Sequence, residues 1–272
     1  MEFNKIPLTT FTPTLADIVG AKSPEKAMDS PLSEFKKFIS DSAGRTSVDK
    51  ILIFNPDAIG QEFYEKYRES IFKSIDDKTD FKINFLTAYP PKTPVCFATM
   101  YTGATPSVHG IEKYEKPTLK IDTLFDAWVR AGKKVAVCAK AKQSIPLLFA
   151  ETHADIYLTS GDKQSVDKGI ELIKNDSYDI IIVYNQEYDD MLHITHPESV
   201  FCKRAARNYV KNFNALLDAV SEFWNKYTVL TAFSPDHGAH RAHKILNGTH
   251  GNNIPSDMNI IHLFKLFGGT HE

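Results

Sequence analysis

The chain has 272 residues, of which 42% are hydrophobic and 24% are charged, and its formal net charge is −2. This composition is typical of a globular protein that is long enough to bury a sizeable core. The 32 basic residues are scattered among 34 acidic ones, so no basic stripe points to nucleic acid or to an anionic membrane surface.

Three features of the sequence indicate where the protein works. The opening residues, MEFNKIPLTTFTPTL, lack the basic and apolar regions of a secretory signal. The longest apolar runs, such as IIIVY at 180–184, are too short to span a bilayer. The cysteines Cys96, Cys138 and Cys202 form no CxxC pair, which fits a reducing compartment better than a disulfide scaffold. We therefore expect a cytoplasmic protein without a membrane partner, and the oligomeric state stays open.

The pattern of apolar residues predicts one domain over 1–272. Residues 1–48 are polar and irregular apart from a predicted helix at 30–39, and we expect them to pack on the domain as an N-terminal extension. Short apolar runs predict buried strands at 51–55, 83–88, 134–139, 179–185 and 228–233. Helical patterns lie between and after them at 61–75, 121–132, 162–175 and 197–227. This alternation predicts an α/β fold, a three-layer αβα sandwich with a mostly parallel central sheet.

Polar and titratable residues follow the predicted strands. They are Asp57, Thr93, Asp189 with His193, and Asp236 with His237, and His250 lies further on in NGTHGNN. Because ligands bind at the carboxyl ends of strands in such sheets, we expect these groups to meet at one edge. Converging carboxylates repel one another unless cations compensate them. Oxygen and imidazole ligands in this mixture suit zinc or manganese.

Each of these residues also has an ordinary structural interpretation. An aspartate after a strand often caps the next helix or forms an Asx-turn. A single histidine is more often a surface group or a hydrogen-bonded core group than a ligand. Asp189 and His193 have the i, i+4 spacing of a pair on one turn of an exposed helix. These interpretations leave unexplained why so many such residues follow strands.

The stretch TPVCFATMYTG at 93–103 reads as a short helix. Thr93 is the predicted N-cap, Pro94 the first helical residue and Gly103 the residue near the C-cap. The amino end of a helix is a favourable anion site. A hydroxyl at that place, in contact with a metal, would lose its proton more readily and act as a nucleophile. The two roles of Thr93 are compatible.

Taken together, these motifs resemble the alkaline phosphatase superfamily, and within it the type I phosphodiesterase/nucleotide pyrophosphatase branch. The stretch PPKTPVCFATMYTGATPSVHGI at 90–111 is similar to the nucleophile segment of that branch. The stretches YDDMLH at 188–193, PDHG at 235–238 and GTHG at 248–251 are similar to its metal-ligand motifs and occur in the same order. The resemblance covers roughly residues 50–254.

The resemblance implies a site with two divalent metal ions, commonly zinc and sometimes manganese. One metal would be held by Asp57, Thr93, Asp236 and His237, and the other by Asp189, His193 and His250. It also implies that Thr93 attacks a small phosphate ester and forms a phosphothreonine intermediate, which water then hydrolyses. The predicted enzyme is a phosphodiesterase or nucleotide pyrophosphatase.

The sequence departs from the pattern of the branch at several places. Cys96 stands where branch members often carry an asparagine that donates to a phosphate oxygen; we interpret it as helix packing first and as a weak substrate contact second. It is not a sulfatase cysteine, since the nucleophile position holds Thr93. His196, His240 and His243 have no counterpart among the ligands. The short stretch between Thr93 and Asp189 leaves little room for an inserted cap domain.

Two alternatives to the diesterase stay open at this point. One is a phosphomonoesterase or phosphomutase on the same core. The other is a catalytically inactive module that binds a metal or an anion, although the full set of ligands and the nucleophile favour an enzyme.

Overall fold

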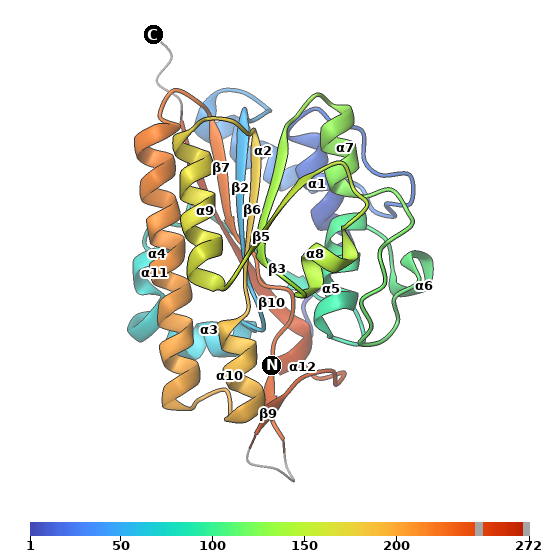
Figure 1. The fold of residues 1–272 in the computed structure, drawn as a ribbon, viewed down its shortest axis with the longest axis vertical. Coiled ribbons are helices and arrows are strands. Elements are labelled where there is room, and N and C mark those ends of the chain that lie inside the picture. The colour runs from blue at the N-terminus through green and yellow to red at the C-terminus, as the bar shows by residue number, and fades with distance from the viewer. Residues whose placement is uncertain (243–246, 269–272) are drawn as a thin grey trace.

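The computed structural model describes residues 1–242 and 247–268, and it consists of one large sheet between two layers of helices (Figure 1). The sheet has eight strands in the order β1-β3-β10-β7-β2-β6-β4-β5. Their bounds, in that order, are Ile6–Pro7, Phe81–Leu86, Asn259–Phe267, Val229–Phe233, Lys50–Pro56, Ile180–Asn185, Val135–Lys140 and Asp155–Thr159. Strand β10 runs antiparallel to both neighbours, and all other pairings are parallel. The predicted α/β class with a mostly parallel sheet is confirmed.

Helices cover both faces of the sheet, because its central strands are apolar on both sides. In β2, Ile51 and Ile53 enter one hydrophobic core, whereas Leu52 and Phe54 enter the other. The first core lies under α1 (Phe11–Asp17), α2 (Ser33–Ala43), α5 (Thr93–Thr102), α7 (Leu124–Arg130) and α8 (Ser144–Leu148). The second lies under α3 (Gln61–Tyr67), α4 (Lys73–Asp76), α9 (Asp162–Lys174) and α11 (Val200–Phe223). Figure 1 shows these two groups on opposite sides of the sheet.

Short elements occupy the edge of the sheet at which the parallel strands end. They are α10 (Glu187–Ile194), α12 (Pro255–Met258) and the two-stranded ribbon of β8 (His240–Arg241) and β9 (Gly248–Thr249). The short helix α6 (Pro106–His109) follows α5 and contacts it. Helix α10, helix α12 and β9 gather near the bottom of Figure 1. None of the described helices combines the length and apolarity that crossing a bilayer requires.

The structure corrects several sequence predictions. Strands β1, β5 and β10 were not anticipated, and the strand predicted at 83–88 runs instead over Phe81–Leu86. The helix predicted at 61–75 is divided into α3 and α4 by a π-helical turn, η2 (Arg68–Phe72). Within the N-terminal extension, β1 pairs with β3 and the side chain of Phe11 is buried in the first core.

Candidate active site

The seven side chains singled out from the sequence lie close together at the carboxyl edge of the sheet. Asp57 follows β2, Thr93 opens α5, Asp189 and His193 belong to α10, Asp236 and His237 follow β7, and His250 follows β9. Because β2, β3, β6 and β7 all run in the same direction, their carboxyl ends lie at the same edge of the sheet. The antiparallel β10 starts at this same edge, so it brings the preceding loop with His250 to the site.

Two fully buried carboxylates, Asp57 and Asp236, flank the imidazole of His237. The Nε2 atom of His237 lies 3.5 Å from Asp57 Oδ1 and 3.4 Å from Asp236 Oδ2. The hydroxyl of Tyr184 donates to Asp57 Oδ2, and the Ala58 N–H donates to Asp236 Oδ1 over 3.2 Å. The other oxygen of each carboxylate has no hydrogen-bond partner among the described residues. Each carboxylate therefore directs its unpartnered oxygen toward His237 Nε2.

A second cluster contains Asp189, His193 and His250. Asp189 Oδ1 lies 3.4 Å from His193 Nε2 and 3.5 Å from His250 Nε2, and the two Nε2 atoms are 3.3 Å apart. Asp189 Oδ1 is buried and accepts no hydrogen bond from the described residues. The two clusters adjoin, because the rings of His237 and His250 stack with centroids 4.0 Å apart.

The hydrogen bonds of the buried imidazoles fix which nitrogen faces the site. His237 donates from Nδ1 to the Gly238 carbonyl over 3.0 Å, and His250 donates from Nδ1 to the Pro91 carbonyl over 2.7 Å. Each ring therefore presents the lone pair of Nε2 to the cluster, which is the arrangement of a histidine metal ligand. A side chain at Gly238 could not be accommodated, since a Cβ there would lie 2.0 Å from the Ser256 carbonyl oxygen.

Burial shifts the pKa of each fully buried group of the site so that its neutral form is favoured. It raises the pKa of Asp57 and of Asp236 well above the ordinary value, and the other carboxylates of the site raise them further. Burial lowers the pKa of His237 to about 3 and that of His250 well below its ordinary value. Among the imidazoles of the two clusters, only that of His193, which is about half exposed, has a raised pKa, because the Asp189 carboxylate 3.4 Å away favours its charged form. The buried imidazoles are therefore neutral, and no lysine or arginine of residues 1–242 and 247–268 forms an ion pair with Asp57 or Asp236.

The residues present fit divalent metal ions. Two sets of ligand atoms lie within 4.8 Å of one another, namely Asp189 with His193 and His250, and Asp57 with Asp189 and His237. Buried carboxylate oxygens without a partner and neutral imidazole lone pairs are the donors that zinc and manganese accept. Asp189 belongs to both sets, so it lies between the two positions at which a cation would be held.

Thr93 is the first helical residue of α5, and the predicted N-cap role is wrong. The N-cap position is taken by Lys92, and no side chain caps the helix. Thr93 is 3% exposed, and its hydroxyl lies 3.1 Å from His237 Nε2. At the other end, Gly103 closes α5 with a φ of 69°, as expected. The hydroxyl of Thr93 therefore does not cap the helix, and it faces the cluster of Asp57, Asp236 and His237.

The remaining sequence candidates lie outside the cluster. Cys96 is completely buried in the first hydrophobic core, and its Sγ lies 3.9 Å from the Ala88 carbonyl oxygen, which favours the packing interpretation. His240 pairs with Asp257 over 2.7 Å and so braces the loop after His237. His196 lines a separate cavity, and His243 lies outside the described residues.

Two residues that were not among the predicted site residues shape the site. The buried Tyr184 holds Asp57, but its position inside an apolar strand gives no signal of that role. Lys92 donates from Nζ to the His250 carbonyl over 2.7 Å, so its side chain turns toward the second cluster. Together with Tyr114 and Asp190 it lines an open cavity of about 410 Å³ that contains Asp189, His193 and His250.

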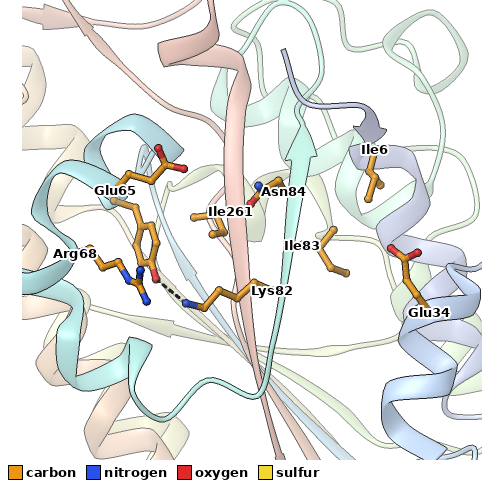
Figure 2. A pocket seen from close by; sticks show the side chains of 9 residues that line it. Ile6, Glu34, Glu65, Arg68, Lys82, Ile83, Asn84 and Ile261 are labelled. Carbon is orange, nitrogen blue, oxygen red and sulfur yellow. Dashed lines mark hydrogen bonds between the residues drawn. The ribbon is translucent and has the colours of Figure 1, made fainter. Parts of the chain in front are cut away.

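A larger cavity, of about 460 Å³, lies elsewhere, beside β3 and α3 (Figure 2). Its cationic side chains, Arg68 and Lys82, both pair with the buried carboxylate of Asp76. Tyr64 also donates to Asp76. Since these groups pair with one another, neither of the two cationic side chains is left free to bind an anionic ligand.

Comparison with known proteins identifies the fold. No family model and no curated sequence matches the chain. Among solved structures, an inactive threonine-to-alanine variant of murine ectonucleotide pyrophosphatase/phosphodiesterase 5 in complex with AMP superposes with a TM-score of 0.57 and 18% identity, over 72% of this chain and 59% of that one. Phosphonoacetate hydrolase from Sinorhizobium meliloti in complex with phosphonoformate gives 0.53 and 16%, over 72% and 57%. A 2-O GAG sulfatase gives 0.59 and 12%, over 82% and 64%.

The chain therefore has the alkaline phosphatase-like α/β fold that these hydrolases share, and it spans less than two thirds of the length of each of the three. The resemblance stated from the sequence is confirmed at the level of this fold, and the nucleotide pyrophosphatase branch is represented among the matches.

Proposed function

We propose that the protein is a metal-dependent hydrolase of phosphate esters in which Thr93 is the nucleophile. The observation that carries this proposal is a cluster of three buried carboxylate oxygens, on Asp57, Asp189 and Asp236, next to the Thr93 hydroxyl; none of the three has a hydrogen-bond partner among the described residues. Such a cluster is costly in a folded protein unless cations bind it. The inactive form of the murine phosphodiesterase, a threonine-to-alanine variant, agrees with a threonine nucleophile.

The chain would hold two metal ions, zinc or manganese. Asp57, Asp236 and His237 with Thr93 form one position, and Asp189, His193 and His250 form the other. When bound, the ions would lower the pKa of the threonine hydroxyl and neutralise charge on the phosphoryl oxygens. The buried Nδ1–H bonds of His237 and His250 keep both rings oriented for this purpose.

The residues of the chain then divide the reaction into two displacements. In the first, Thr93 Oγ1 releases its proton to solvent and bonds to phosphorus, while the bond from phosphorus to the leaving oxygen breaks and its electron pair goes with that oxygen. In the second, water bonds to phosphorus and gives up a proton, the bond to Oγ1 breaks, and Oγ1 takes up a proton, which restores the hydroxyl. The amino end of α5, at which Thr93 lies, places the positive end of a helix dipole beside the transferred group.

Charge favours a phosphodiester or a nucleotide pyrophosphate as the substrate. Two divalent cations and three aspartates leave a balance of about +1. Lys92 adds one positive charge near the second cluster, but Asp190 lines the same cavity and offsets it. This balance matches a diester monoanion better than a monoester dianion.

The test is turnover by metal-stripped protein to which zinc or manganese is returned. We expect bis-p-nitrophenyl phosphate to be hydrolysed faster than p-nitrophenyl phosphate, Thr93→Ala to be inactive with unchanged metal content, and Thr93→Ser to keep part of the activity. Thr102→Ala is the matched control, since Thr102 is also buried on α5 but bonds the Ala98 carbonyl. Full activity in Thr93→Ala contradicts the nucleophile. Preference for the monoester supports the phosphomonoesterase, and metal binding without any turnover supports the binding module.

A further inference from the structure

Three consecutive backbone carbonyls, those of residues 234–236, each accept a hydrogen bond from a buried side chain. They lie directly before the proposed ligand His237, and the last of them belongs to the proposed ligand Asp236. Asn55 Nδ2 donates to Ser234 over 2.7 Å, His262 Nε2 to Pro235 over 2.8 Å, and Thr87 Oγ1 to Asp236 over 2.5 Å. All three donors are at most 4% exposed. The donors come from β2, from β10 and from the segment after β3.

These hydrogen bonds replace the backbone hydrogen bonds between β7 and its neighbouring strands, which end before residues 234–236. Strand β7 ends at Phe233, and after the Ser234 N–H has donated to Phe54, the chain leaves the sheet. Pro235 has no N–H with which to anchor itself. Because the segment is buried, water does not reach these carbonyls, and losing a donor would leave a buried acceptor without a hydrogen bond, which is unfavourable.

His262 is the most informative of the three donors. Its ring is fully buried and packs against Phe11 and Phe85, with centroids 5.3 Å and 4.7 Å away. Burial lowers its pKa to about 3, so the ring is neutral. Its Nδ1 atom has no partner among the described residues, which is itself unfavourable. An apolar residue would suit this cage better, so the one favourable polar contact of the imidazole, with the Pro235 carbonyl, accounts for its presence.

The same network reaches the helix that carries the proposed nucleophile. The Tyr101 hydroxyl on α5 donates over 2.6 Å to Asn55 Oδ1, while Asn55 Nδ2 donates to Ser234. A single asparagine therefore joins the helix of Thr93 to the segment that leads to Asp236. Both oxygen and nitrogen of its amide are used, so the amide cannot turn without losing a bond on each side.

We propose that Asn55, Thr87 and His262 are positioning residues that set the backbone of 234–236, so that Asp236 and His237 face Thr93 before any metal binds. This inference rests on the proposed function, since it gives the ligands their purpose. It predicts that these residues contribute to metal affinity although none of them is a ligand. Partners that orient metal ligands typically contribute 10–100-fold to affinity.

The test compares two isosteric substitutions of buried threonines, one in the segment after β3 and one on β7. Thr87→Val removes the hydroxyl that holds Asp236, whereas Thr231→Val removes a buried hydroxyl on β7 that bonds the Lys265 carbonyl over 3.2 Å, away from the site. Zinc affinity is measured by competition with a chromogenic chelator, and thermal unfolding is measured on the metal-free proteins. We expect Thr87→Val to bind zinc at least tenfold more weakly, Thr231→Val to bind it like the wild type, and Thr87→Ser to restore the affinity.

A second variant keeps the test decisive if Thr87→Val does not fold. His262→Phe fills the aromatic cage and removes only the donor to Pro235, so we expect a stable protein with at least tenfold weaker zinc binding. Wild-type affinity in folded Thr87→Val or His262→Phe overturns the inference and leaves the proposed function intact. A wild-type protein that binds no zinc or manganese overturns the proposed function, and the inference with it.

Discussion

Replacing Asp57 by asparagine should make the metal-free protein more stable while it weakens metal binding. The carboxylate is completely buried, and only one of its oxygens has a partner, the Tyr184 hydroxyl. An asparagine can accept the same hydrogen bond through its carbonyl and turn its NH₂ group toward His237 Nε2, which lies 3.5 Å from the free oxygen. Removing an unsatisfied buried group of this kind is worth about 1–3 kcal/mol.

The sign of the pH dependence follows from the raised pKa of Asp57. Burial first, and then Asp236 and Asp189, hold its pKa in the folded protein well above the value of 3.8 for an unperturbed carboxyl. The folded metal-free protein therefore binds a proton that the unfolded chain has lost, and this contribution to stability is present at low pH and disappears as the pH rises through the folded pKa. The advantage of Asp57→Asn should be small near pH 4 and should grow toward pH 8.

The assay is urea or thermal unfolding of chelator-treated protein between pH 4 and pH 8, repeated with zinc. At a free zinc concentration about 100 times the dissociation constant, the wild type should gain about 2.7 kcal/mol per site, or roughly 5–10 °C in Tm. Asp57→Asn should gain clearly less.

The matched control is Asp176→Asn, because Asp176 forms an ion pair with the buried Lys50 over 2.8 Å. This substitution should destabilise the protein with or without metal. If metal-free Asp57→Asn is also less stable than the wild type at pH 8, other groups of the folded protein stabilise the Asp57 carboxylate, and its second oxygen is not a source of instability.

Three further predictions concern single side chains. Asp189→Ala should reduce the bound metal from about two ions to about one or fewer, because Asp189 lies between both positions; unchanged stoichiometry by elemental analysis would exclude this. Cys96→Ala should leave kcat/KM within about twofold, because the thiol is buried in the core; a loss above tenfold with metal content intact would make it a functional contact. Asp76→Asn should lower the free energy of unfolding at pH 7. Hydrogen bonds from Arg68 and Lys82 outweigh burial and lower the pKa of Asp76 to about 2, so the deficit should shrink as the pH falls from about 4 toward 2, which denaturant titration checks.

Much of the candidate site could be predicted from the sequence, because one rule of the fold places it there. Parallel strands end at one edge, so Asp57, Asp189 and Asp236, each a few residues after an apolar run, had to approach one another. The same reasoning failed at Thr93, which begins the helix without capping it. The N-cap is the last residue with an extended backbone, which here is Lys92, and the hydroxyl of Thr93 turns toward His237.

The sequence by itself determined the strands β2, β3, β4, β6 and β7 and the helices α5, α9 and α11, since burial on one or both faces leaves a periodic pattern in neighbouring residues. It also determined which ends of the strands carry the chemistry. Only the tertiary structure decided that β10 enters the sheet antiparallel, between β3 and β7, and that it brings His262 behind Pro235. Strand order and the carbonyl network join residues such as Asn55, Thr87 and His262, which are far apart along the chain. No local periodicity records such contacts, because they form only when the whole sheet has assembled.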